Sequence, residues 1–275
     1  MYAWIERKVA AYKYPAKHEE PCKVVSPDSE FSGEAVVDHS VWDTLLKQHV
    51  RRGVIDGVEL TTVDYESLAK DERVKDYRKT LADVHVEKLS SNEELTLFIN
   101  SYNFLCVDLI LNHYIREGKL PKSINNLSTR KKEVWDLPAG VIGGKEYTLG
   151  EIEHSVLRAK WKEPRIHASI VCASVSCPDL RNEAFIVQKL NEQMDDQVRS
   201  WLKNTKKGSC VTGKNLHLSR IFNWFYNDFV AVDPRGPVKW LSNYSDDTSD
   251  VKALISSGKY STKYMNYIWN LNVAT

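Results

Sequence analysis

The stretch Ser91-Asn-Glu-Glu-Leu-Thr-Leu-Phe-Ile-Asn-Ser-Tyr-Asn-Phe-Leu-Cys-Val-Asp-Leu-Ile-Leu-Asn-His-Tyr-Ile115 decides the fold. Ser91 and Glu94 match a capping box, in which the two side chains satisfy the first free N–H groups of a helix. Apolar residues then occupy nearly every face of the helix, and Gly118 follows its end. Because such a helix has to be covered on all sides, the pattern predicts a buried central helix.

Three polar residues stand one turn into this apolar stretch: Asn100, Tyr102 and Asn103. A buried amide without a partner costs on the order of a few kcal/mol, so each of them is expected to form hydrogen bonds. Two interpretations remain open. The three residues tie a neighbouring loop to the core, or they orient a catalytic histidine and line a substrate pocket.

A second stretch, Arg165-Ile-His-Ala-Ser-Ile-Val-Cys-Ala-Ser-Val-Ser-Cys-Pro-Asp-Leu180, carries two thiols. Its apolar run predicts a strand that holds His167 and Cys172, followed by a tight loop. Pro178 is typical of a first helical position, which makes Cys177 the residue that caps the helix. Free N–H groups and the helix dipole favour a thiolate there. We therefore expect Cys177 to be reactive and Cys172 to be a core thiol, whereas the alternative makes both of them small core residues.

Between these stretches, Thr148 and Glu151 form a second capping box, which opens a helix to about residue 160. In an α-helix Glu151, His154 and Arg158 fall on one face. This face places an acid, an imidazole and a guanidinium together, although an ordinary solvent-exposed surface has the same pattern.

The totals restrict the class of protein. The chain has 275 residues, of which 42% are hydrophobic and 27% charged, and its formal net charge is +1. This composition is globular, and it gives no overall electrostatic case for nucleic acid or a membrane as a partner. Charged residues near the N-terminus and the lack of a long unbroken apolar run predict a cytoplasmic protein. Five cysteines, an odd number at irregular spacing, predict reduced thiols.

The chain divides into an N-terminal arm over residues 1–35 and one globular domain over residues 36–275. Within the domain a helix is expected after Asp38, and a hairpin over residues 210–218. Because helices outnumber short, scattered strands, we expect an α+β fold. It would be a helix-rich single domain with a buried central helix and a small sheet, and its architecture would be papain-like or transglutaminase-like.

Several pieces of the chain, in their order, resemble the DUF547 domain family, which is catalogued as a domain of unknown function. They are residues 38–43, 98–103, 143–144, 149–154, 157–158, 163–167, 172–180, 221–229 and 267–272. The family more often has Ala at the position of Ser101 and Gly at that of Ala173. The resemblance implies a shared fold, but it assigns no reaction.

Our first functional hypothesis is a cysteine-dependent hydrolase or acyltransferase that acts on an amide, ester or thioester. Cys177 would be the nucleophile, His154 or His167 the base, and Asn103 or Glu153 the group that orients the histidine. Six further residues would line the substrate site: Asn100, Tyr102, Arg158, Arg165, Cys172 and Ser174. No cofactor is expected, and the ligand would be a small molecule or peptide.

Three other hypotheses remain. The first is a non-catalytic interaction or ligand-binding module with a protein partner. The second is a zinc site built from His154, His167, Cys172 and Cys177, although the spacing of the cysteines is unlike a familiar zinc knuckle and no metal is expected. The third is a redox role in which Cys172 and Cys177 form a reversible pair.

Overall fold

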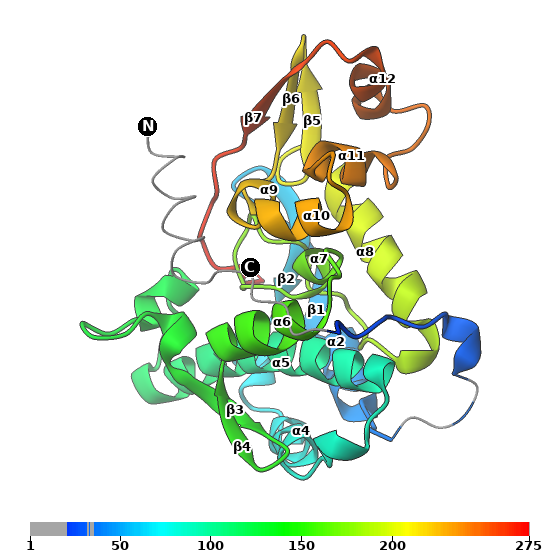
Figure 1. Cartoon of the computed structure of the whole chain (residues 1–275). Helices are drawn as coiled ribbons and strands as arrows, with labels where there is room; N and C mark the ends of the chain where they lie inside the picture. Colours follow the sequence, from blue (N-terminus) through cyan, green and yellow to red (C-terminus); the bar gives the residue numbers. More distant parts are fainter. Residues whose placement is uncertain (1–20, 32, 34–35, 275) are drawn as a thin grey trace.

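The computed structural model describes residues 21–31, 33 and 36–274 (Figure 1). Its α-helices are α2 (Ser40–His49), α3 (Tyr65–Leu68), α4 (Arg73–Ala82), α5 (Ser91–Glu117), α6 (Arg158–Lys160), α7 (Ile166–Ser169), α8 (Leu190–Lys203), α9 (Ile221–Trp224), α10 (Tyr226–Val232), α11 (Pro237–Ser242) and α12 (Asp250–Ser257). The 3₁₀-helices are η1 (Asp28–Glu30), η2 (Val86–Lys88), η3 (Ile124–Leu127), η4 (Val134–Asp136) and η6 (Val187–Lys189), while η5 (Glu151–Leu157) is a π-helix.

Three small sheets accompany these helices. Strands β1 (Val50–Ile55) and β2 (Val58–Val63) form one antiparallel pair, and β3 (Pro138–Ile142) and β4 (Lys145–Thr148) form another. The third sheet joins β5 (Ser209–Thr212), β6 (Asn215–Leu218) and β7 (Ser261–Tyr264). In it β5 and β6 form the expected hairpin, and β7 lies parallel to β6. The predicted helix-rich α+β class is confirmed.

Helix α5 is the buried central helix that the sequence predicts. It crosses the lower half of the molecule, with α4 and the β3–β4 pair below it and α6 above it (Figure 1). Among the described residues α5 is the one helix long and apolar enough to cross a membrane, yet 94% of its apolar window is buried within the protein. Its capping box starts one residue earlier than expected, with Ser90 and Glu93, and Gly118 ends it in a left-handed conformation with φ of 69°.

Two large hydrophobic cores and one small cluster, in which Val58 and Leu60 pack against Val175, lie in the described part of the chain. The larger core surrounds α5, and the smaller one joins the second half of α8 to β6, α9, α10 and α11. The segment that contains both thiols runs between the two cores, because Ile166 and Cys177 pack into the larger one and Ala168 into the smaller one.

Two predictions for this segment are wrong. The backbone at His167 forms the short helix α7 instead of a strand, and the described backbone after Cys177 has no helix before Val187. Cys177 is therefore no helix cap. Side chains from distant elements bind this backbone: Thr61 Oγ1 donates to the carbonyl of Leu180 at 2.8 Å, and Asn100 exchanges two hydrogen bonds with Phe185 at 2.8 and 3.0 Å. These contacts replace the ladder that a helix would have formed.

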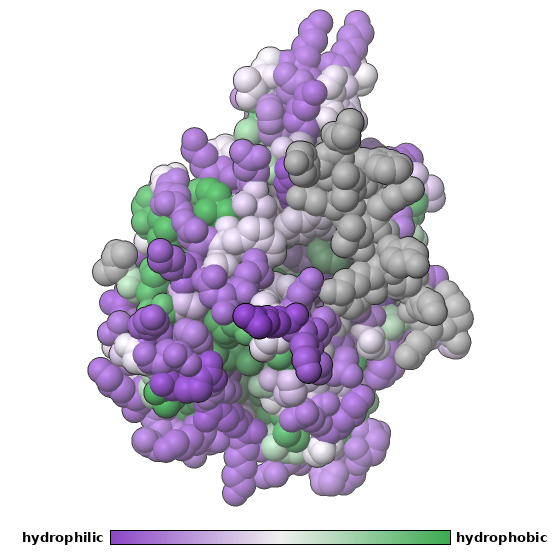
Figure 2. All heavy atoms as spheres, turned by 90° about the vertical axis from the view of Figure 1, so that its left-hand side faces the viewer, coloured by the Kyte–Doolittle hydropathy of each residue, from purple (hydrophilic) through white to green (hydrophobic). Residues whose placement is uncertain are grey.

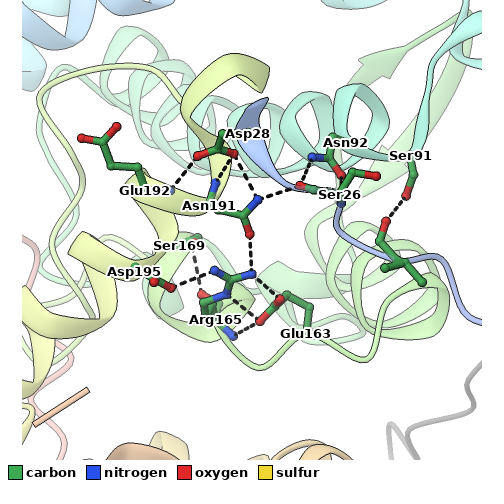
Figure 3. Close-up of polar contacts among 11 residues, drawn as sticks. Ser26, Asp28, Ser91, Asn92, Glu163, Arg165, Ser169, Asn191, Glu192 and Asp195 are labelled. Atoms are coloured by element: carbon green, nitrogen blue, oxygen red, sulfur yellow. Dashed lines mark hydrogen bonds and ion pairs between the residues drawn. The ribbon is translucent and has the colours of Figure 1, made fainter. Parts of the chain in front are cut away.

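The predicted arm over residues 1–35 lies partly outside the described residues. Its described part is attached to the domain, as Figure 3 shows for two of its residues. Ser26 exchanges hydrogen bonds of 2.9 Å with Asn92 on α5, and Asp28 accepts from the backbone N–H of Asn191 on α8 at 2.9 Å. This part of the arm therefore connects two helices of the domain.

Candidate functional site

The most unusual group in the described chain is the thiol of Cys172, which is half-buried on an extended segment directly after α7. Its Sγ lies 3.0 Å from Ser174 Oγ and 3.2 Å from Tyr267 Oη, and these two hydroxyls are themselves 3.2 Å apart. A hydrogen bond with the Cys177 side chain is the largest effect on the thiol. Despite the opposing effect of burial, this bond and those of the two hydroxyls lower the pKa of Cys172 to about 7.

Cys177 is the second member of this pair, and its environment is the opposite. Its side chain is only 5% exposed, and its Sγ accepts a hydrogen bond from the backbone N–H of Cys172 at 3.0 Å. Burial raises the pKa of the Cys177 thiol well above its ordinary value, and the neighbouring Cys172 raises it further. Near neutral pH a proton therefore leaves Cys172 first, while Cys177 keeps its own.

The backbone next to Cys172 is strained. Ala173 has φ of 55°, a left-handed conformation that costs a residue with a Cβ on the order of 1 kcal/mol. This explains why Gly is more frequent at this position in the family that the chain resembles. In the described part of the chain, the backbone N–H of Ala173 has no hydrogen-bond acceptor, and that of Ser174 is directed at the Cys172 thiol. The backbone N–H of Ser174 is therefore the donor that lies beside the Cys172 sulfur.

A carboxyl group stands near the thiols on η5. Of the expected face of Glu151, His154 and Arg158, the latter two remain in contact, whereas Glu151 forms the predicted capping box with Thr148. Glu153 is half-buried instead, and Tyr102 donates a hydrogen bond to its Oε2 at 3.3 Å. Burial raises the pKa of Glu153 to about 7 against the lowering effect of Arg158, and the charge of Cys172 also raises it. Single π-helical turns are frequent at functional sites.

Asp228 on α10 organises a cluster of two histidines and one arginine. It accepts from Arg158 Nε at 2.6 Å and from Arg158 Nη2 at 2.9 Å, and it lies 2.8 Å from His167 Nε2. Although burial opposes ionisation, these partners hold the pKa of Asp228 well below its usual range. Sequence reasoning did not select Asp228, although it lies in one of the pieces that resemble the family.

The two predicted base histidines belong to this cluster. His154 Nδ1 lies 2.7 Å from Arg158 Nη1, and the His167 ring stacks on Phe225 with centroids 4.1 Å apart. Burial lowers the pKa of His167, while burial and Arg158 lower that of His154 to about 3. In the described part of the chain, neither sulfur of the cysteine pair is hydrogen-bonded to a histidine ring.

The polar residues of α5 bind backbone. Asn103 Nδ2 donates to the carbonyl of Ser169 at 2.9 Å, and its Oδ1 accepts from the N–H of Val171 at 2.9 Å. Asn100 holds Phe185 in the same way. Both amides therefore tie loops to the core, the first of the two interpretations, and Asn103 also fixes the backbone immediately before Cys172.

Arg165 connects the start of α7 with α8 through its guanidinium. Figure 3 shows its guanidinium between Glu163, Asp195 and Asn191. It forms an ion pair with Glu163 at 2.6 Å and with Asp195 at 2.8 Å, and it donates to Asn191 Oδ1 at 2.9 Å. These bonds link the start of α7 to α8, so the guanidinium that was expected to bind substrate has three partners within the protein.

Aromatic side chains flank the thiols. Tyr267 contacts Trp224 and Trp269 with ring centroids 4.8 and 4.6 Å apart, and Trp135 lies 6.4 Å from Trp269. All four rings are half-buried. On the side of the molecule that carries the C-terminal tail, residues of intermediate hydropathy gather among more hydrophilic ones (Figure 2). Sequence reasoning did not select Tyr267 as a site residue, although it begins one of the pieces that resemble the family.

The four residues of the zinc hypothesis do not converge. His167 lies against Asp228 and His154 against Arg158, whereas the two cysteines contact each other. Across the described ranges no group of three or more His, Cys, Asp or Glu side chains is arranged to hold a metal ion. The zinc hypothesis therefore has no ligand set in this part of the chain.

These features define a helix-rich α+β domain with a dithiol and a carboxyl group between two cores. The family model of DUF547, described as a protein of unknown function, matches residues 86–202. The matched segment contains α5, η5 and both cysteines. Neither a curated protein nor a solved structure matches the chain.

Proposed function

We propose that the protein is a cysteine-dependent hydrolase or acyltransferase that acts on an amide, ester or thioester, with Cys172 as its nucleophile. The observation that carries this proposal is the set of hydrogen bonds around Cys172 Sγ, from Cys177, Ser174 and Tyr267. A thiolate is the nucleophilic form of cysteine, and these bonds favour it near neutral pH. The nucleophile therefore moves from Cys177, the residue that the sequence favoured, to its partner.

In the first step, the Cys172 thiolate attacks the carbonyl carbon of the substrate, so that an S–C bond forms and the carbonyl oxygen becomes an oxyanion. The negative charge moves from sulfur to oxygen, and the backbone N–H of Ser174 beside the sulfur, together with that of Ala173, would bind it. Preorganised donors of this kind make one of the greatest contributions to the rate of enzymatic acyl transfer.

Glu153 is the proton carrier of the proposal. A carboxyl with a pKa of about 7 is protonated in part of the molecules at neutral pH and ionised in the rest, which suits a group that first gives and later accepts a proton. It would donate its proton to the leaving nitrogen, oxygen or sulfur, and it would then accept a proton from the water that hydrolyses the acyl-enzyme. In a transferase, an alcohol, amine or thiol takes the place of that water.

The cluster around Asp228 has a positioning role in this scheme. Arg158 connects η5, which carries Glu153, to α10, and His167 connects α7, which precedes Cys172, to the same carboxylate. The cluster therefore fixes the two helices on which the acid and the nucleophile depend. His154 and His167 hold this geometry and do not act as the base.

Alkylation with iodoacetamide across a pH series tests the nucleophile. The rate at Cys172 should reach half its maximum near pH 7, below the value of about 8.5 for an ordinary thiol, and Cys172→Ser should abolish it. Cys210, a half-buried thiol far from the site in sequence, provides the matched control, because Cys210→Ser should leave this rate unchanged. A half-point at or above pH 8.5 would overturn the proposal.

Turnover tests the reaction. A panel of acyl thioesters, esters and anilides should include a substrate that the reduced protein cleaves, and Cys172→Ser should lose this activity. Cleavage that continues in Cys172→Ser would contradict the role of Cys172. A complete lack of cleavage across all three bond types, together with a reactive Cys172, would contradict the acyl-transfer reaction itself.

A further inference from the structure

We infer that Cys172 and Cys177 form a reversible disulfide when a hydroperoxide oxidises Cys172, so that Cys177 is the resolving thiol of a peroxide-sensitive switch. In the acyl-transfer mechanism above the buried Cys177 only donates a hydrogen bond to Cys172 and takes part in no bond that forms or breaks. The switching of activity rests on the proposed function, because it requires Cys172 to be the nucleophile. The formation of the disulfide does not depend on it.

The fold brings the two sulfur atoms together. The N–H of Cys177 donates to the carbonyl of Ser174 at 3.1 Å, so the chain turns back on itself between the two cysteines. This turn places Cys177 Sγ 3.0 Å from the backbone nitrogen of Cys172, and the two thiols are hydrogen-bonded to each other. A disulfide requires two sulfur atoms that can approach to about 2.05 Å, and the contact of Cys177 Sγ with the Cys172 backbone places both cysteines within one turn of the chain.

Exposure sets the order of events. Cys172 is half-buried and reaches solvent, whereas Cys177 is 5% exposed and has its sulfur against Cys172. A small oxidant therefore meets Cys172 first. Cys106 is the other thiol that could form a disulfide with Cys172, because the charge of Cys172 raises its pKa. Cys106 is 0% exposed, however, and no hydrogen bond joins it to Cys172.

The chemistry balances with one hydroperoxide. The Cys172 thiolate attacks one peroxide oxygen, so that an S–O bond forms, the O–O bond breaks and the leaving oxide takes a proton. Cys172 is then a sulfenic acid. The Cys177 sulfur attacks Cys172 Sγ, the S–S bond forms, and the hydroxyl of the sulfenic acid leaves as water with the proton of the Cys177 thiol. Two thiols lose two electrons to the peroxide, and an external dithiol such as dithiothreitol reverses the reaction.

The disulfide would stop acyl transfer, and it would also protect Cys172 against irreversible oxidation. While Cys172 is linked to Cys177 it has no thiolate to attack a carbonyl, so acyl transfer stops. Without a resolving thiol, further peroxide would oxidise the sulfenic acid to sulfinic acid, which is not reversed by a simple dithiol.

The experiment treats the reduced full-length chain with one equivalent of hydrogen peroxide, blocks the remaining thiols with N-ethylmaleimide and maps them by mass spectrometry. Trypsin cleaves after Arg165 and Arg181, so both cysteines fall on one peptide. We expect this peptide to lose two hydrogen atoms and to take up no maleimide, and dithiothreitol to restore both. A link from Cys172 to Cys106, or a peptide that still takes up two maleimides, would overturn the inference.

Two variants sharpen the result. In Cys177→Ser, Cys172 should accumulate a sulfenic acid that dimedone labels, followed by sulfinic acid, and Cys177→Ala should behave in the same way. Cys210→Ser is the matched control and should form the 172–177 link as the unaltered chain does. If Cys172 stays reducible in Cys177→Ser and Cys177→Ala to the same extent as in the unaltered chain, the resolving role of Cys177 is contradicted.

Failure of the switch and failure of the proposed function are distinguishable. If the reduced chain cleaves substrates and forms no 172–177 link, the switch is wrong and the hydrolase stands. If the link forms and no acyl substrate is cleaved, the disulfide stands and the acyl-transfer function is wrong.

Discussion

The sulfur of Cys177 lies 3.0 Å from the backbone nitrogen of Cys172 and accepts its hydrogen bond. This contact joins two thiols that look equivalent in the sequence but differ in burial and hydrogen bonding. It fixes the loop that carries Cys172, and it places a protonated thiol beside the sulfur that ionises first. The ionisation of Cys172 therefore depends on tertiary neighbours, which gives the first prediction.

Replacing Tyr267 by Phe should raise the pKa of Cys172. The Tyr267 hydroxyl lies 3.2 Å from Cys172 Sγ, and a hydrogen bond to the charged form of a group lowers its pKa. We expect the half-point of alkylation to move from about pH 7 toward the ordinary thiol value. Trp269→Phe, in the same aromatic group but without a bond to the sulfur, is the control. Equal half-points in Tyr267→Phe and the unaltered chain would refute the role of the hydroxyl.

Glu153→Gln should lower kcat about 10²-fold or more, because general acid–base catalysis typically contributes that much. Cleavage by the unaltered protein should be bell-shaped in pH. Below pH 7 Cys172 gains a proton and the nucleophile is lost, whereas above pH 7 Glu153 loses the proton that it donates. In Glu153→Gln only the loss of cleavage below pH 7, which is due to Cys172, should remain, and the loss above pH 7 should disappear.

Glu151→Gln provides the comparison for that experiment, because Glu151 lies two residues away on the same π-helix, is exposed and binds only the start of the helix at Thr148. It should keep both limbs of the pH profile. If Glu153→Gln keeps a bell-shaped pH dependence of cleavage, Glu153 is excluded as the proton carrier.

Asn103→Ala should destabilise the fold by roughly 2–4 kcal/mol, because it leaves the buried carbonyl of Ser169 and N–H of Val171 without partners. Urea unfolding measures this loss. Asn112, on the exposed side of the same helix, is the matched control, and Asn112→Ala should cost less than about 1 kcal/mol. Similar losses of unfolding free energy in the two variants would argue against a stabilising role for the two hydrogen bonds of Asn103.

His39 should make the stability depend on pH. Burial lowers its pKa from 6.5 to about 4, and its Nδ1 lies 2.7 Å from the Tyr77 hydroxyl. Between these two pH values the unfolded chain binds the proton more readily, so stability is complete above pH 6.5 and falls as the pH drops toward 4. The loss should be about 3 kcal/mol, at about 1.4 kcal/mol per pKa unit.

Unfolding free energies at pH 7 and pH 4.5 test this prediction. His39→Asn keeps a polar group near Tyr77 and should reduce the difference between the two pH values, of which His154 and His167 keep the rest because their pKa values are also lowered. His85→Asn, at an exposed histidine, should leave the difference unchanged. An unaltered pH dependence in His39→Asn would assign the effect to other groups.

The start of α5 shows what the local sequence can predict and what it cannot. Ser90–Glu93 and Ser91–Glu94 are both capping boxes, one residue apart, and the local pattern cannot separate them. The structure uses the first pair, because Ser91 Oγ donates to the carbonyl of Val24 at 2.9 Å and Glu94 Oε1 binds Lys160 at 2.6 Å. Contacts with distant segments thus set the register of the helix.

The sequence by itself determined the elements whose causes are local: the apolar periodicity of α5, the capping box of Thr148 and Glu151, and the β5–β6 hairpin. Only the tertiary structure decided which cysteine is the candidate nucleophile. Tyr267, which lies 95 residues beyond Cys172 in the chain, supplies one of the hydrogen bonds that favour its thiolate, and burial keeps Cys177 protonated. Hydrogen bonds and desolvation depend on neighbours in space, and no spacing along the chain records them.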